Sequence, residues 1–276
     1  MRITINQVKE FKSKGQKFAM LTAYDYATSR IVDEAGSPLI LVGDSLGMVV
    51  LGYDSTIPIT MDIMIHHTRA VVKGSKNALV VGDMPFMSYH LSEEQALGNV
   101  ARFLQEAGAQ AVKLEGGVNV AATIKRIVDC GIPVMGHIGL TPQSVNQLGG
   151  FRAQGKTAES AHKLISDAVA LEEAGAFAVV LETVPSELAE IITQKIKIPT
   201  IGIGAGPNCD GQVQVINDIL GLSDFIPRHA RKYADVREIM STVVQKYISD
   251  VANGMFPTPA ESIQMVESEL IQLQSS

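Results

Sequence analysis

Residues 38–44 read PLILVGD, an apolar run that ends on a carboxylate, and residues 79–85 read LVVGDMP, with the same Val-Gly-Asp ending. Short runs of Leu, Ile and Val bounded by Pro or Gly are typical of strands buried on both faces of a parallel sheet. The repeated acid indicates that one structural position, the carboxyl end of a strand, recurs along the chain. The fold is therefore expected to be built from repeated strand units.

Similar apolar runs alternate with longer segments of helical periodicity, a pattern that indicates βαβ units. The helical segments carry recognisable boundaries: Ser92 opens SEEQALGNVARFLQEAG, which has Glu in its first turn and Gly108 after its last. Gly131 and Gly175 mark similar ends. The expected strands cover residues 18–25, 38–45, 78–85, 110–116, 133–139, 177–183, 199–206 and, as a weak eighth, 223–227.

Eight such units in about 200 residues predict a (β/α)8 TIM barrel. A doubly wound sheet is less suitable, because no GxGxxG follows the first expected strand. We therefore expect residues 1–276 to form a single barrel domain with a helical C-terminal extension from about residue 228. Residues 139–157, which are rich in Gly and Gln, follow the fifth strand and are expected to form a loop or lid over the barrel mouth.

Composition narrows the class of protein. The chain has 276 residues, 46% of them hydrophobic and 19% charged, so it can bury a large core. A net charge of −6 and a single short basic cluster at residues 228–232 argue against a nucleic-acid partner. No apolar stretch reaches the roughly 20 residues of a membrane span, and the charged N-terminus does not resemble a signal peptide, so we expect a cytoplasmic protein. Cys130 and Cys209 lack metal-site spacing and receive no role.

Polar side chains follow or end the expected strands, at the edge where barrel enzymes build their sites. Carboxylates crowded there would repel one another unless a cation compensated them. Oxygen ligands without a His-Cys cluster favour Mg²⁺ over Zn²⁺. The candidate residues are Asp44, Asp83, Lys113, Glu115, His137 and Glu182.

Structural alternatives exist for each candidate. Asp44 and Asp83 could cap the helices that follow them. Lys113 and Glu115 stand two apart in a strand and share a face, where they could bind a ligand or form a structural ion pair inside the barrel.

Two further candidates are equally open. Glu182, an isolated acid after an apolar run, could be a general base or a buried structural residue. His137 could donate a hydrogen bond to a substrate oxygen or be a satisfied core histidine. The run IGIGAG (201–206) could grip a phosphate or allow close backbone packing.

Seven longer segments of the chain can be compared with known families as a set. They are LTAYD (21–25), LVGDSLGMVVLGYDST (41–56), GDMPFMSY (82–89), VKLEGG (112–117), GHIGLTPQSVNQLGGFRAQGK (136–156), LETVPSELA (181–189) and IPTIGIGAGPNCDGQ (198–212). In their order and spacing, these segments resemble the ketopantoate hydroxymethyltransferase family. The resemblance spans about residues 5–257.

The resemblance implies a (β/α)8 barrel related to phosphoenolpyruvate mutase and isocitrate lyase. It implies transfer of a hydroxymethyl group from 5,10-methylenetetrahydrofolate to 3-methyl-2-oxobutanoate, giving 2-dehydropantoate in pantothenate biosynthesis. It also implies Mg²⁺, small-molecule substrates and a homodecamer. By position, the family's metal-binding acids fall on Asp44, Asp83 and Glu115, its oxo-acid contacts on Asp44, Ser45, Asp83 and Lys113, and its proton acceptor on Glu182.

The implied chemistry accounts for the acids. Mg²⁺ would make the C3 proton of a chelating 2-oxo acid more acidic, Glu182 would remove that proton, and Lys113 would stabilise the resulting enolate. One alternative is a Mg²⁺-dependent lyase or mutase of the same superfamily, although those relatives carry a cysteine on a loop and residues 139–157 contain none. Another is a barrel that binds a metabolite without turning it over.

Overall fold

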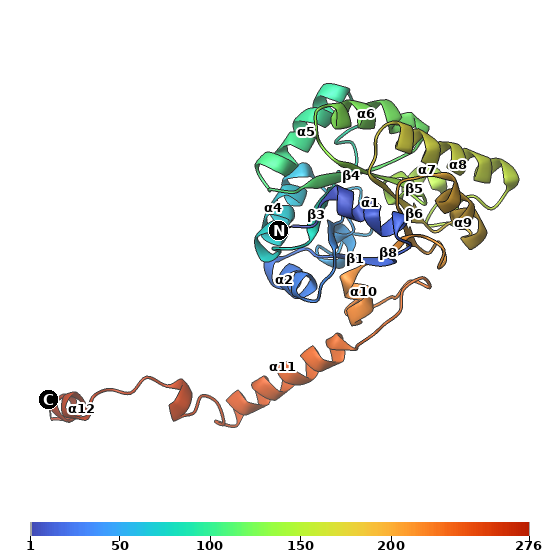
Figure 1. The fold of residues 1–276 in the computed structure, drawn as a ribbon. Helices are drawn as coiled ribbons and strands as arrows, with labels where there is room; N and C mark the ends of the chain where they lie inside the picture. Colours follow the sequence, from blue (N-terminus) through green and yellow to red (C-terminus); the bar gives the residue numbers. More distant parts are fainter. Residues whose placement is uncertain (1, 276) are drawn as a thin grey trace.

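The computed structural model describes residues 2–275, and its centre is a closed barrel of eight parallel strands in chain order (Figure 1). The predicted (β/α)8 TIM barrel is therefore confirmed. The strands are β1 (Phe18–Thr22), β2 (Leu39–Val42), β3 (Leu79–Asp83), β4 (Ala111–Glu115), β5 (Val134–Gly139), β6 (Ala178–Glu182), β7 (Thr200–Ile203) and β8 (Gly211–Gln214).

Helices surround this barrel and end where the sequence predicts. The Ser92 hydroxyl caps α5 by accepting a hydrogen bond from the Gln95 N–H, and Gly108, Gly131 and Gly175 adopt positive φ after their helices. No helix within residues 2–275 is both long and apolar enough to cross a membrane. The helices are α1 (Ile5–Ser13), α2 (Tyr26–Glu34), α3 (Leu46–Val49), α4 (Met61–Gly74), α5 (Glu93–Gln105), η1 (Val118–Val120), α6 (Ala121–Asp129), η2 (Pro142–Ser144), α7 (Val145–Leu148), α8 (Ala158–Glu173), α9 (Ser186–Lys195), α10 (Ile216–Leu220), α11 (Val236–Ala252), η3 (Pro259–Glu261) and α12 (Glu267–Gln274).

The predicted eighth strand at residues 223–227 is wrong. The barrel closes instead through Gly211–Gln214, which pairs with β1 on one side and β7 on the other. This strand reads GQVQ and has one large apolar residue, so a search for apolar runs misses it. Its glycine is required by packing, because a Cβ on Gly211 would lie 2.5 Å from the Phe18 ring. Phe225, in the segment predicted to be the strand, is 77% exposed.

Strand alternation divides the core into two layers. Leu39 and Leu41 point into the barrel, whereas Ile40 and Val42 pack in the layer that includes residues of the surrounding helices. Because side chains alternate along a strand, the same rule sends Lys113 and Glu115 inward, since Val112 and Leu114 belong to the outer layer. The fold thus places charged side chains inside the barrel mouth.

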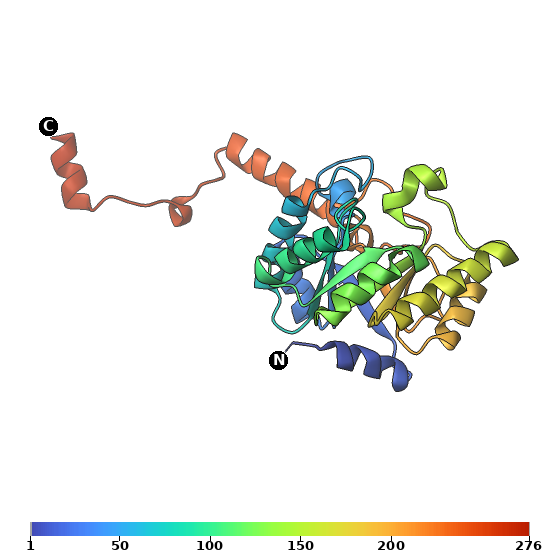
Figure 2. The ribbon, with the colours of Figure 1, turned by 90° about the horizontal axis from the view of Figure 1, so that it is seen from above.

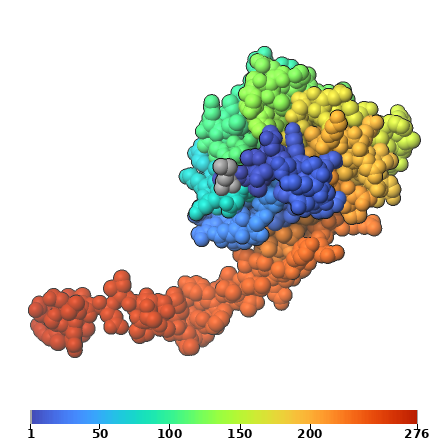
Figure 3. All heavy atoms as spheres, in the orientation of Figure 1, coloured from blue at the N-terminus to red at the C-terminus, as the bar shows by residue number. Residues whose placement is uncertain are grey.

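Residues up to about 234 still contact the barrel and α10, and the chain then leaves the barrel as a helical C-terminal extension. Helices α11 and α12 lie on an arm that runs away from the barrel in two perpendicular views, and the space-filling view shows it as a separate projection (Figures 1, 2 and 3). Neither helix contains a buried residue. An exposed apolar stripe runs along α11 through Met240, Val244, Tyr247, Ile248 and Val251.

Replacing Gly82 by Ala should lower the free energy of unfolding by about 1–3 kcal/mol, because the added Cβ would lie 2.4 Å from the buried Phe103 ring. Gly98→Ala in α5 is the matched control. The added Cβ meets nothing within 4 Å, so this substitution should raise the free energy of unfolding by up to about 1 kcal/mol. Urea unfolding of both variants measures the difference, and equal midpoints would contradict the packing inferred at Gly82.

Candidate active site

A buried ion pair forms the centre of the barrel mouth. Lys113 Nζ lies 2.5 Å from Asp83 Oδ1 and 3.9 Å from Glu115 Oε1, and all three side chains are buried. Burial alone would lower the pKa of the Lys113 ammonium, but Asp83, Glu115 and Asp44 outweigh it and raise that pKa above its ordinary value. The ammonium therefore stays charged inside the barrel.

Asp44 completes a pair of carboxylates beside this lysine. Its main-chain N–H donates to Asp83 Oδ2 at 3.3 Å, and its own Oδ2 accepts from Gln143 Nε2 at 2.9 Å. Burial and then the charges of Asp83 and Glu115 hold the pKa of Asp44 well above its usual range. Burial also raises the pKa of Asp83, although Lys113 opposes this shift. The positive charge of Lys113 therefore does not fully compensate the negative charges of Asp44 and Asp83.

The helix-cap alternative for the two aspartates is wrong. The helix after β2 has Ser45 at its N-cap position, with no side-chain capping bond, and α5 after β3 is capped by Ser92. The Ser45 hydroxyl instead lies 3.0 Å from the Tyr24 hydroxyl. Asp44, Asp83 and Ser45 therefore make contacts within the barrel mouth and do not cap the helices that follow them.

His137 stands between two carboxylates. Its Nδ1 lies 3.2 Å from Glu115 Oε1 and its Nε2 lies 3.2 Å from Glu182 Oε2. Neither N–H points along a hydrogen bond, so the attraction is between charges rather than through aligned donors. Burial and Lys113 act to lower the pKa of His137, but the two glutamates raise it to about 9. Glu182, which follows an apolar run in the sequence, therefore has an imidazolium on one side.

Sequence reasoning missed Gln143 and Tyr89. Gln143 is buried, and its Oε1 accepts a hydrogen bond from the Tyr89 hydroxyl at 2.8 Å, while its main-chain N–H donates to Glu115 Oε2 at 3.1 Å. Both residues lie within conspicuous segments, GLTPQS and FMSY, but a polar residue in a polar loop carries no signal of burial. Only the folded loop shows that the glutamine points inward.

The segment predicted to be a lid does lie at the barrel mouth. The Leu140 N–H donates to the Glu182 carbonyl at 2.8 Å, and the Gln154 N–H donates to the Thr183 carbonyl at 3.1 Å. Thr183 has a positive φ of 49°, an uncommon conformation for a β-branched residue, directly after Glu182. Figure 2 shows the part between these ends, which includes α7, rising from the barrel. The segment therefore borders both Glu182 and the aspartates.

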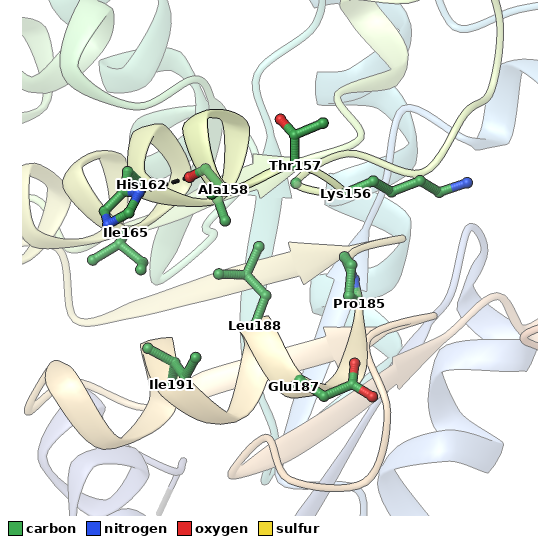
Figure 4. Close-up of a pocket in the computed structure, with 11 residues that line it drawn as sticks. Lys156, Thr157, Ala158, His162, Ile165, Pro185, Glu187, Leu188 and Ile191 are labelled. Carbon is green, nitrogen blue, oxygen red and sulfur yellow. Dashed lines mark hydrogen bonds between the residues drawn. The ribbon is translucent and has the colours of Figure 1, made fainter.

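Two surface pockets lie elsewhere. One, of about 350 Å³, lies between the starts of α8 and α9 and is lined by Lys156, Ile165, Leu188 and Ile191 among others (Figure 4). The other, of about 590 Å³, includes the Gly204–Gly206 turn of the predicted glycine-rich motif. Neither pocket is lined by any of the acids predicted for the site.

Comparison with known proteins identifies the family. A sequence profile described as ketopantoate hydroxymethyltransferase matches residues 2–259. The chain belongs to the ketopantoate hydroxymethyltransferase family. A relative from Dehalococcoides mccartyi, named 3-methyl-2-oxobutanoate hydroxymethyltransferase, is 65% identical over 99% of this chain and 97% of its own length. A relative of the same name from Chloroflexus aurantiacus is 60% identical over 98% of this chain and 96% of its own length.

Solved structures share the barrel at low sequence identity. Phosphonopyruvate hydrolase in complex with oxalate and Mg²⁺ has a TM-score of 0.59 at 14% identity and covers 99% of this chain and 95% of its own. A 2,3-dimethylmalate lyase of the phosphoenolpyruvate mutase/isocitrate lyase superfamily has a TM-score of 0.58 at 14% identity with the same coverage. These likenesses establish a common fold. The sequence profile and the similar relatives confirm the expected membership of the ketopantoate hydroxymethyltransferase family.

Replacing Lys113 by Met should lower the free energy of unfolding by about 3–5 kcal/mol, because it leaves Asp83 buried without its cation. Adding Asp83→Asn should restore part of this loss. Lys125→Met is the control, since the Lys125–Asp129 pair is exposed and should contribute less than about 1 kcal/mol. Denaturant unfolding of the wild type and of these three variants provides the four values. A Lys113→Met variant as stable as the control would refute the buried pair.

Proposed function

We propose that this protein transfers a hydroxymethyl group from 5,10-methylenetetrahydrofolate to 3-methyl-2-oxobutanoate, giving 2-dehydropantoate for pantothenate biosynthesis. One observation carries the proposal: a buried lysine, paired acids and a glutamate next to an imidazolium meet at one barrel mouth. Such a set provides a place for an anionic 2-oxo acid, a base for its C3 proton and positive charge for the resulting enolate. The names of the closely similar relatives support the substrate assignment.

The charges of the cluster fit a divalent cation. When ionised, Asp44, Asp83, Glu115 and Glu182 carry four negative charges against the two positive charges of Lys113 and His137. Among residues 2–275 no three His, Cys, Asp or Glu side chains are arranged to hold a metal by themselves. A cation that takes one or two carboxylates and completes its shell with water and substrate oxygens suits such a site, as Mg²⁺ does.

We assign Asp44 and Asp83 to hold the Mg²⁺ directly. Glu115 is the third acid predicted for the metal, and we place it beside the cation, because its carboxylate already meets Lys113, His137 and the Gln143 N–H. When bound, the cation acts as a Lewis acid that withdraws electrons from the oxo acid.

The protein side chains then have separable roles. Glu182 is half-buried at the end of β6, where it can accept the C3 proton. Lys113 holds a buried positive charge beside Asp83 and Glu115, where it can stabilise negative charge developing on the substrate oxygen. His137 keeps Glu182 in place through its charge. The Ser45 hydroxyl, beside Tyr24, is the remaining contact assigned to the oxo acid.

Glu182→Gln should slow deuterium exchange at C3 of 3-methyl-2-oxobutanoate by about 100-fold or more, because the amide cannot accept the proton. Proton NMR in D₂O follows the loss of the C3 signal, with Mg²⁺ or with EDTA. The wild-type protein should exchange only with the metal present. Glu187→Gln, which changes an acid on α9 outside the cluster, should exchange at the wild-type rate. Rapid exchange by Glu182→Gln would reject the assigned base, and no exchange by the wild type with tetrahydrofolate present would reject the mechanism.

We also propose that the protein is a homo-oligomer, the family suggesting a decamer, and that α11 contributes to its contacts. The apolar stripe of α11 is exposed on an arm that leaves the barrel (Figure 3). A continuous exposed apolar stripe of this kind is typical of surfaces that contact another protein.

The double variant Val244→Asp/Ile248→Asp should reduce the molar mass measured by light scattering after size exclusion, because it places charge on the apolar stripe. Gln245→Glu, on the same helix but outside the stripe, should keep the wild-type mass. An unchanged mass for the double variant would exclude α11 from the contacts.

A further inference from the structure

Gln143 connects the lid segment to the acid cluster through several bonds at once. Its Nε2 donates to Asp44 Oδ2 at 2.9 Å and to the Met84 carbonyl at 2.8 Å. Its main-chain N–H donates to Glu115 Oε2 at 3.1 Å. Asp44 follows β2 and Glu115 ends β4, so one loop residue spans acids from two non-adjacent strands.

The orientation of the carboxamide is itself fixed. The Tyr89 hydroxyl donates to Gln143 Oε1 at 2.8 Å, so the Nε2 end must face Asp44. Tyr89 is buried, and its hydroxyl also accepts from the Glu115 main-chain N–H at 3.1 Å. The amide therefore cannot rotate without losing hydrogen bonds at both ends.

Between Gln143 and Gly155 the segment is more exposed than at these two residues. Residues 146, 147 and 149 are exposed, as are residues 151 and 152. Gly155 closes the segment, and it packs against α9 so tightly that a Cβ would lie 2.4 Å from Leu188 Cδ2. Gln143 and Gly155 are thus anchors on either side of an exposed stretch that borders Glu182.

We infer that Gln143 is a positioning residue that couples docking of the 140–155 segment to Asp44, which is proposed to hold the cation, and to Glu115, which is placed beside it. With the segment docked, the Gln143 amide donates to Asp44 Oδ2 and the main-chain N–H of Gln143 donates to Glu115 Oε2, so one residue holds both carboxylates that would face a bound cation. When the segment lifts, both acids lose a donor together. This inference rests on the proposed function for its metal, but the tethering of the segment is independent of it.

The test compares Gln143→Met with Gln147→Met in the full-length protein. Methionine matches glutamine in length but cannot donate a hydrogen bond, and Gln147 is exposed on α7. Binding of Mn²⁺, measured by electron paramagnetic resonance without substrate, should weaken by about 10–100-fold for Gln143→Met alone. Tryptic cleavage after Arg152, an exposed residue of the same segment, should become faster for that variant only.

The outcomes separate this inference from the proposed function. If the wild type binds no Mn²⁺, the proposed metal site fails, and the cleavage rates still decide whether Gln143 tethers the segment. Faster cleavage with unchanged Mn²⁺ affinity would overturn its role toward the cation, and unchanged values in both assays would overturn the whole inference. If Gln143→Met does not fold, Tyr89→Phe removes the bond that orients the same amide and should give the same two changes at smaller size.

Discussion

The structure of the site depends on keeping ionised groups inside the barrel, where water does not solvate them. Lys113 offsets part of the free-energy cost of burying the charge of Asp83, and His137 offsets part of that cost for Glu115. Asp44 has an amide rather than a cation as its partner, and burial beside two other acids raises its pKa. A buried cluster whose negative charge is incompletely compensated is expected where a cation and an anionic substrate bind.

The barrel supplies this arrangement through two geometric rules. Parallel strands bring their carboxyl ends to one rim, and alternation along each strand sends every second side chain inward. In β4 the inward positions include Lys113 and Glu115, while Val112 and Leu114 face the helices. Glycine at position 82 then lets Phe103 of α5 press against β3 directly before Asp83.

Parts outside the repeating units are attached in different ways. The segment after β5 is fastened at its ends by Gln143 and Gly155, while much of its middle is exposed to solvent. The arm that contains α11 presents a helix with an exposed apolar stripe and runs away from its own barrel. Substrate binding would add contacts to the first segment, and binding of another subunit would add contacts to the second.

The sequence by itself determined the barrel, seven of its strands within a few residues, and the acids, lysine and histidine at their ends, because apolar runs and strand-end polar residues are local patterns. It misplaced β8, since Gly211–Gln214 has a strand's position without a strand's composition and is defined by its neighbours β1 and β7. Only the tertiary structure decided that Gln143 and Tyr89 enter the site and that His137 contacts both Glu115 and Glu182. Those contacts join residues far apart in the chain, and no local pattern encodes the direction in which a buried polar side chain points.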